Sequence, residues 1–145
     1  MQNEPPVQAS PASPVVTATK SSTGLDENVA SLLAYVFGLV SGLIFFFIEK
    51  DSRLVRFHGM QSTLLAGVFW IGEIALWILS TILVIIIGYI SGLLGTLVWF
   101  VMMLVAFVLG IAALIGWVMC MIKAYGGQYF KLPVLGNFAE KFSQK

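Results

Sequence analysis

Residues 64–122 form an apolar stretch that contains a single charged side chain, Glu73. A transmembrane helix needs about 20 apolar residues to cross about 30 Å of hydrocarbon. The stretch is too long for one such helix and too short for three helices with their loops, so it predicts two. We place them at about 64–87 and 93–122, on either side of the glycine-rich segment 88–95, which favours a tight reversal.

A third apolar run covers residues 29–48 and follows Asp26 and Asn28, which are suitable helix caps. The chain is 59% hydrophobic and only 10% charged, whereas soluble domains are about 25% charged. The predicted fold class is therefore an all-α integral membrane protein with three transmembrane helices in contact with membrane lipids. Residues 1–28 hold four of the five prolines and are predicted to be a disordered tail, which leaves 29–145 as the membrane domain.

The positions of the Lys and Arg residues predict the orientation, because these residues concentrate in cytoplasmic loops. With three spans, the loop around Asp51 and the C-terminal tail share one side of the membrane, and that side holds seven of the eight Lys and Arg residues. The other side holds Lys20 alone. The sequence thus predicts an N-terminus outside and a C-terminus in the cytoplasm. The net charge of +1 provides no basic face for nucleic acid.

The polar segment after the first apolar run holds five of the fifteen charged side chains and the single histidine, His58. On a helix over about 52–62, Arg53 and Arg56 share one face and His58 lies on the opposite face. We expect this helix to lie at the cytoplasmic surface, with both arginines among anionic headgroups and His58 toward the helix bundle. In the alternative, the arginines only enforce topology and His58 caps a carbonyl group. One histidine without further ligands predicts no metal site.

A second interfacial helix is predicted at about 133–142, after the glycine pair 126–127 ends the third span. Leu135, Phe138 and Phe142 recur there at three- and four-residue steps, which is the spacing of one helix face. The predicted protein therefore carries two short amphipathic helices on one side of the membrane, an arrangement suited to docking a partner.

Glu73 is the sharpest single candidate, because a carboxylate inside a span is costly unless it is protonated or paired. If its helix runs unbroken from Leu54, then Ser62, Glu73 and Ser80 lie on one stripe that faces the bundle. Glu73 either serves a function there or holds two helices together as a neutral hydrogen-bonding group. The sequence leaves both interpretations open.

Small residues at four-residue spacing predict close helix packing. In the first span, Gly38 and Gly42 form a GxxxG motif, which allows helices to pair. In the third span, Gly110 pairs with Ala106 and Gly116 with the alanine four residues before it. These pairs of the third span are typical of packing within one helix bundle.

Two polar segments, EKDSRLVRFHGMQS at 49–62 and IKAYGGQYFKLPVLGNFAEKF at 122–142, carry a resemblance to a known family. Over residues 24–142 the chain resembles small prokaryotic membrane proteins related to the chloroplast inner-envelope import subunit called Tic-twenty. The Met60-Gln61-Ser62 run belongs to its most specific part, so Gln61 becomes a candidate functional residue. The resemblance implies a multi-pass protein of the prokaryotic plasma or inner membrane, and the plastid relative suggests protein translocation.

The sequence holds no Walker loop and no GxSxG, HExxH or CxxC motif, and Cys120 is its single cysteine. We therefore predict no enzymatic activity, no cofactor and no metal site. The predicted function is a scaffold or assembly role, in which the cytoplasmic helices bind lipid or a protein partner and the spans self-associate. The alternative is an oligomeric translocation or conducting subunit with a polar path lined by Ser62, Glu73 and Ser80.

Overall fold

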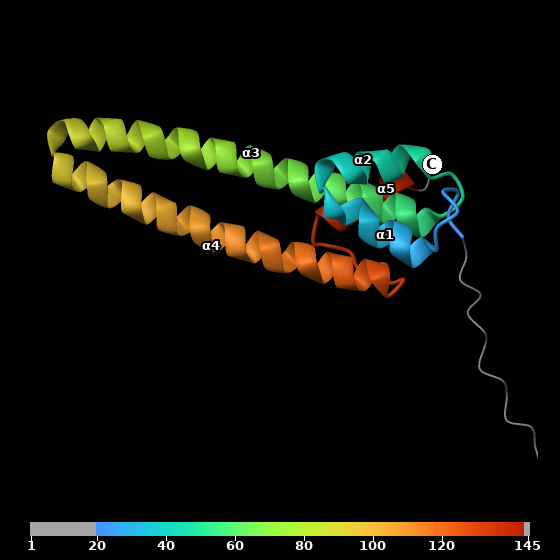
Figure 1. The fold of residues 1–145 in the computed structure, drawn as a ribbon. Coiled ribbons are helices and arrows are strands. Elements are labelled where there is room, and N and C mark those ends of the chain that lie inside the picture. Colours follow the sequence, from blue (N-terminus) through green and yellow to red (C-terminus); the bar gives the residue numbers. More distant parts are fainter. Residues whose placement is uncertain (1–19, 144–145) are drawn as a thin grey trace, which may run out of the picture.

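The computed structural model describes residues 20–143, and every regular element in this range is a helix apart from one isolated bridge between Lys20 and Asp26 (Figure 1). This confirms the all-α class. The helices are α1 (Glu27–Val36), α2 (Leu39–Ile48), α3 (Arg53–Ile90), α4 (Gly92–Tyr125) and α5 (Leu135–Ser143). By length and composition, α3 and α4 are able to cross a membrane. The other three helices gather at one end of this long pair.

The two long helices are joined at Ser91, inside the glycine-rich segment where the sequence predicted a reversal. Ser91 has an extended backbone, and its hydroxyl accepts a hydrogen bond from the Leu94 amide as the N-cap of α4. A Cβ atom on Gly95 would lie 2.6 Å from the Cα atom of Gly88. Two facing glycines thus let the backbones of α3 and α4 approach closely beside the turn.

The predicted first span over 29–48 is wrong as a single helix, because the chain reverses at Gly38 between α1 and α2. Gly38 has a φ angle of +54°, which side chains with a Cβ atom rarely adopt. The Ser41 hydroxyl donates to the Ala34 carbonyl at 2.9 Å and accepts from the Phe37 amide at 3.0 Å. Ten helical residues extend about 15 Å, half the thickness of the hydrocarbon core, so neither α1 nor α2 can span it.

The α1–α2 hairpin packs along α3 in a regular antiparallel register. A Cβ atom on Gly38 would lie 3.5 Å from the Cβ atom of Ala66, and one on Gly42 would lie 2.7 Å from the carbonyl oxygen of Gly59. These pairs step backward along α2 as they step forward along α3. The hairpin tip is therefore level with Ala66, roughly 20 Å from the start of α3.

The Gly42→Ala substitution is expected to lower the free energy of unfolding by about 1–3 kcal/mol, the usual cost of overpacking. The added methyl group would lie 2.9 Å from the backbone nitrogen of Thr63 as well as close to the Gly59 oxygen, and backbone atoms cannot move aside as a side-chain end can. Detergent unfolding followed by tryptophan fluorescence measures the change. Gly72→Ala is the control, because no atom lies within 4 Å of its added methyl group. Equal losses in both variants would contradict the packing argument.

Among the residues that the structure describes, the buried side chains all belong to the hairpin end of the molecule. No side chain between residues 63 and 119 is buried, whereas Tyr35, Phe57 and Cys120 are fully buried. There α1 also packs against α4, and the indole N–H of Trp117 donates to the Tyr35 carbonyl at 3.0 Å. The rest of the α3–α4 pair has no core of its own, so its stability depends on what surrounds it.

Three predicted boundaries change in the structure. The predicted interfacial helix at 52–62 is not separate, because it forms the first turns of α3. The helix predicted at 133–142 is present as α5, which buries Gly136, Ala139 and Ser143, while its position at the membrane surface stays a prediction. The part of the predicted tail at residues 20–28 is ordered, and Ser22 is hydrogen-bonded to the end of α2. The remainder of the predicted tail, residues 1–19, lies outside the residues that the structure describes.

Candidate functional site

A group of polar side chains is buried where α1, α3 and α4 meet, and we call Tyr35, His58 and Gln61 the polar cluster. All three side chains are fully buried. The Tyr35 hydroxyl lies 3.1 Å from Nδ1 of His58 and 3.1 Å from Nε2 of Gln61. The same Gln61 nitrogen lies 3.6 Å from Sγ of Cys120. The polar cluster thus ties three helices together at one point.

The hydrogen bonds of His58 define its protonated nitrogen. Nε2 of His58 lies 3.0 Å from the carbonyl oxygen of Gln128, and because a carbonyl oxygen only accepts, Nε2 carries a proton. In the neutral ring, Nδ1 then accepts the proton of the Tyr35 hydroxyl, whose oxygen in turn accepts from Gln61. His58 faces the bundle and bonds a carbonyl group, which agrees with its structural interpretation. Both ring nitrogens are used, and none is directed toward a ligand.

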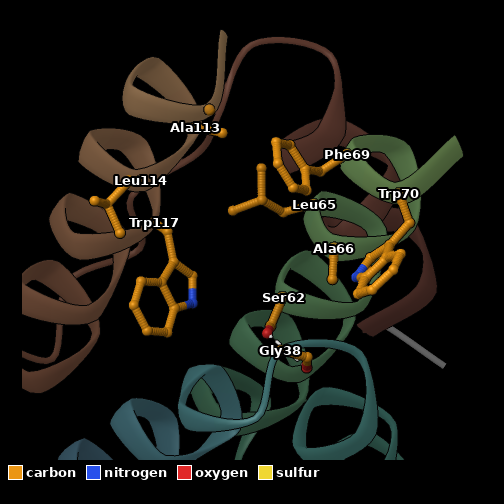
Figure 2. A pocket seen from close by; sticks show the side chains of 10 residues that line it. Gly38, Ser62, Leu65, Ala66, Phe69, Trp70, Ala113, Leu114 and Trp117 are labelled. Atoms are coloured by element: carbon orange, nitrogen blue, oxygen red, sulfur yellow. Dashed lines mark hydrogen bonds between the residues drawn. The ribbon is translucent and has the colours of Figure 1, made fainter. Parts of the chain in front are cut away.

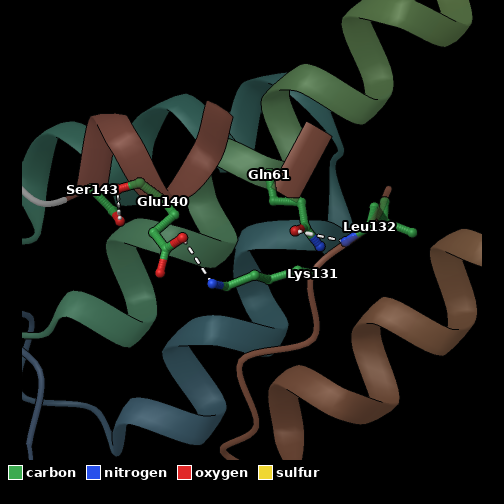
Figure 3. Close-up of polar contacts among 5 residues, drawn as sticks. All are labelled: Gln61, Lys131, Leu132, Glu140 and Ser143. Carbon is green, nitrogen blue, oxygen red and sulfur yellow. Dashed lines mark hydrogen bonds and ion pairs between the residues drawn. The ribbon is translucent and has the colours of Figure 1, made fainter. Parts of the chain in front are cut away.

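Gln61 holds the segment 126–134, which joins α4 to α5, against α3 (Figure 3). Its Nε2 donates to the carbonyl oxygen of Phe130 at 3.0 Å, and its Oε1 accepts from the amide of Leu132 at 3.4 Å. The side-chain amide therefore satisfies one backbone acceptor and one backbone donor of this segment. An exposed ion pair of 2.8 Å between Lys131 and Glu140 links this segment to α5.

Glu49 closes the base of the hairpin. Its carboxylate is buried and accepts hydrogen bonds from the Ser22 hydroxyl at 2.8 Å and from the amides of Ser22, Asp51 and Ser52 at 2.9–3.2 Å. Burial by itself raises the pKa of this carboxyl, but the hydrogen bonds from Ser22, Ser52 and Asp51 outweigh burial and lower the pKa to about 2. The segment before α1, the end of α2 and the start of α3 are thereby joined through one charged group.

The two predicted headgroup arginines have different surroundings. Arg53 is exposed at the first position of α3. Arg56 is half-buried, and its guanidinium carbon lies 5.4 Å from the centre of the Phe46 ring, which is a cation–π geometry. Its buried Nε atom has no hydrogen-bond partner within residues 20–143. Arg53 is thus free to meet an anionic headgroup, whereas Arg56 packs against the hairpin.

The predicted polar stripe of α3 faces α4. A groove of about 260 Å³ lies between the two helices and the hairpin tip (Figure 2), and Ser62, Trp70 and Trp117 are among its lining residues. Two further grooves along the same helix pair contain Glu73, and one of them contains Ser80. Glu73 is half-buried there and makes no hydrogen bond or ion pair within residues 20–143. Both interpretations of Glu73, the functional and the structural one, stay predictions.

The predicted packing glycines divide into two groups. Gly38 and Gly42 pack against α3 of the same chain, as the hairpin register shows. Apart from the backbone of α4 itself, no atom of residues 20–143 lies within 4 Å of a Cβ atom placed on Gly110 or Gly116. Gly110 nevertheless lines the groove between α3 and α4, and packing of the third-span pairs within the bundle stays a prediction.

Sequence reasoning missed the roles of Tyr35, Glu49 and Trp117. In the sequence, Tyr35 is one residue of an apolar run. The partners of its hydroxyl group, His58 and Gln61, lie on α3 and meet it only once the hairpin is folded. Glu49 was noticed as a charge, but its four donors include Ser22, which is far from it in the sequence. The N-cap position of Ser52 next to Arg53 was the one local signal that α3 begins there.

Residues 24–139 match the model of a family described as the magnetosome magnetite crystal formation protein family. The chain is 42% identical over 127 residues to a UPF0132 membrane protein of Methanocaldococcus jannaschii, covering 86% of this chain and 96% of the relative. It is 37% identical over 117 residues to a UPF0132 membrane protein of Archaeoglobus fulgidus, covering 81% of this chain and 95% of that relative. No solved structure matches the chain. The similarity to the chloroplast import subunit stays a prediction.

Proposed function

The chain belongs to this family of small membrane proteins, and on that basis we propose that it is a non-enzymatic membrane scaffold that presents its hairpin end to a partner at the cytoplasmic surface. The observation that carries the proposal is the uneven packing of the molecule. Within residues 20–143, all buried side chains lie at one end, held by the polar cluster and Glu49, while the long helices beyond that end have none. A rigid end on an apolar stem suits anchoring and docking.

The proposed topology has two spans, α3 and α4, with the α1–α2 hairpin entering and leaving on one side. Ser22 and Glu49 meet at the base of the hairpin, so the segment before α1 and the segment after α2 share that side. In the sequence all eight Lys and Arg residues lie before residue 57 or after residue 122, hence on the same side again. A bias of eight to none favours a cytoplasmic location for both ends of the chain. This replaces the expectation of an outside N-terminus.

Single cysteines at Lys20 and Lys141 are expected to react with an impermeant thiol reagent from the same side of oriented membrane vesicles, because both lie at the hairpin end. A cysteine at Tyr89 is the matched control and is expected to react from the opposite side, since Tyr89 lies at the far end of α3 and is 95% exposed. Comparing right-side-out with inverted vesicles measures all three. Labelling of Lys20 and Lys141 from opposite sides would restore the three-span topology.

We place the hairpin inside the membrane rather than in water because its outer surface is apolar. Phe37, Val40 and Phe47 are exposed on it, and burying a large apolar side chain is favourable by about 1.5–3 kcal/mol. The long helices exceed the hydrocarbon core, since 38 and 34 residues extend about 57 and 51 Å against about 30 Å. Tilt of the helices and entry of the hairpin into the cytoplasmic leaflet together accommodate this excess.

The docking surface that we propose includes the outer face of α5. This helix directs small residues toward α3 and leaves Phe138 and Phe142 exposed on the other side. A photo-crosslinker at Phe142 in native membranes is expected to capture a discrete partner, and the same crosslinker at Tyr89 is expected to capture no such partner. Capture of the same proteins from both positions would contradict a docking role for the hairpin end.

The stripe of Ser62, Glu73 and Ser80 along the α3–α4 grooves favours a second candidate, a conducting or translocating oligomer. Several copies would have to bring these grooves together around a path. Proteoliposomes distinguish the two functions, because a scaffold is expected to show no ion flux. Flux that Glu73→Gln abolishes, in a variant that assembles normally, would favour the second candidate and overturn the first.

A further inference from the structure

The molecule has a different thickness at its two ends. At the hairpin end, α1 and α2 lie beside the start of α3 and the end of α4, and α5 packs against α3 as well, so at least four helices share one cross-section. Beyond the hairpin tip at Gly38, which is level with Ala66, only α3 and α4 continue (Figure 1). Since a helix with its side chains is about 10 Å wide, the cross-section about doubles from one end to the other.

The surface of the thicker end is apolar and points outward. Along α2, Val40, Ile44 and Phe47 are exposed at helical spacing, and α2 packs on α3 with its other face through Gly42. On α4, Ile122 is exposed at the same end of the molecule. This surface is continuous with the lipid-facing surface of the long helices and stops at charged positions. Those positions are Lys50, Asp51, Arg53 and Lys123.

A charged collar with three cations and one carboxylate around an apolar surface matches one leaflet of a bilayer. Lys and Arg prefer the level of anionic headgroups, and the ten residues of α2 reach about 15 Å inward from that level, half of the hydrocarbon core. The occupant of the α2 surface is therefore the acyl-chain region of the leaflet on the hairpin side. The α1–α2 hairpin adds two helices to that leaflet and none to the other.

We propose that the α1–α2 hairpin is a one-leaflet wedge, which makes the protein concentrate in strongly curved membranes whose convex surface is on the hairpin side. A protein that is wider in one leaflet relieves the bending strain of a membrane in which that leaflet is on the convex side. This inference rests on the proposed two-span topology but not on the scaffold role, because a single copy of the chain suffices for it.

The test uses the full chain, labelled with a fluorophore through a cysteine at Lys141 and reconstituted at low density into vesicles of phosphatidylcholine with phosphatidylglycerol. The number of copies per lipid area is compared between small sonicated and large extruded vesicles. We expect a several-fold enrichment in the small vesicles, with Lys141 on their outer, convex face. Equal density in both vesicle sizes would overturn the wedge.

Two matched double variants locate the effect. Val40→Ser with Phe47→Ser changes side chains that are 59% and 72% exposed on the hairpin, and it is expected to remove most of the enrichment. Ile85→Ser with Leu93→Ser changes side chains that are 66% and 72% exposed at the thin end, and it is expected to keep the enrichment. An equal loss in both variants would show that general apolarity, rather than the hairpin, is responsible, and would overturn the proposal.

The same samples separate the wedge from the other proposals. Opposite labelling of Lys20 and Lys141 would mean that the topology itself is wrong, and the wedge would fall with it. Labelling on one side without any size preference would overturn the wedge alone. Enrichment that appears only when copies are crowded in each vesicle would assign the α2 surface to a second copy of the chain, which also contradicts the wedge.

Discussion

Gln61→Leu is expected to lower the free energy of unfolding by about 2–4 kcal/mol, although leucine has nearly the volume of glutamine. The substitution leaves the Phe130 carbonyl and the Leu132 amide without the partner they have in the wild type, and each unsatisfied buried group costs about 1–3 kcal/mol. It also removes the hydrogen bond to the Tyr35 hydroxyl. Detergent unfolding followed by tryptophan fluorescence measures the loss.

The control for this substitution is Gln128→Leu. Gln128 is exposed and takes part in the polar cluster only through its backbone carbonyl, so we expect little change in stability. A second measurement, hydrogen exchange of the Leu132 amide, should accelerate in Gln61→Leu and stay unchanged in the control. If both variants lose the same stability, or if exchange at Leu132 is unaffected, Gln61 does not hold the segment that leads to α5.

Glu49→Gln is expected to lower the free energy of unfolding at neutral pH by about 1.5–3 kcal/mol, the range for hydrogen bonds to a charged group. The lowering of the Glu49 pKa from 4.5 to about 2 has the same sign, because it means that the folded protein stabilises the charged carboxylate. A glutamine side chain has the same shape but carries no charge, so its carbonyl oxygen accepts these hydrogen bonds more weakly. Its NH2 group would take the place of Oε2 and could not accept from the Ser22 amide. The base of the hairpin, where Ser22 meets Glu49, is expected to open first.

The lowered pKa of Glu49 also predicts how the stability difference between the two proteins depends on pH. Because the pKa of Glu49 is lower in the folded state than its ordinary value of 4.5, its contribution is complete above about pH 4.5 and disappears as the pH falls toward 2. The difference in stability between wild type and Glu49→Gln should therefore shrink over that window. Glu140→Gln is the control, since an exposed ion pair contributes about 0–1 kcal/mol. A difference that does not change with pH would show that ionisation of Glu49 is not what matters.

The candidate residues illustrate how far sequence patterns reach. Helical spacing placed His58 on the face opposite Arg53, and the structure directs it into the bundle. The heptad stripe placed Glu73 on the face of α3 that lines the grooves beside α4. Periodicity is a property of one helix, so it can be read from the chain. The partners of these residues lie on other helices, and no local pattern identifies Tyr35 or Gln128 as the neighbours of His58.

The sequence by itself determined the membrane class, the helical fold, the reversal at Ser91 and the amphipathic helix α5. Each of these follows from the length of an apolar run, from glycines that break it or from the spacing of one helix face, and such signals are local. Only the tertiary structure decided that residues 29–48 fold back on themselves, because one long helix and two short ones bury the same kind of apolar surface. Three features favour the hairpin over a single long helix: the positive φ angle of Gly38, the contact of Gly42 with Gly59, and the hydrogen bonds between Glu49 and Ser22. The last two of these join residues that are distant in the chain, and they exist only once the hairpin is packed against α3.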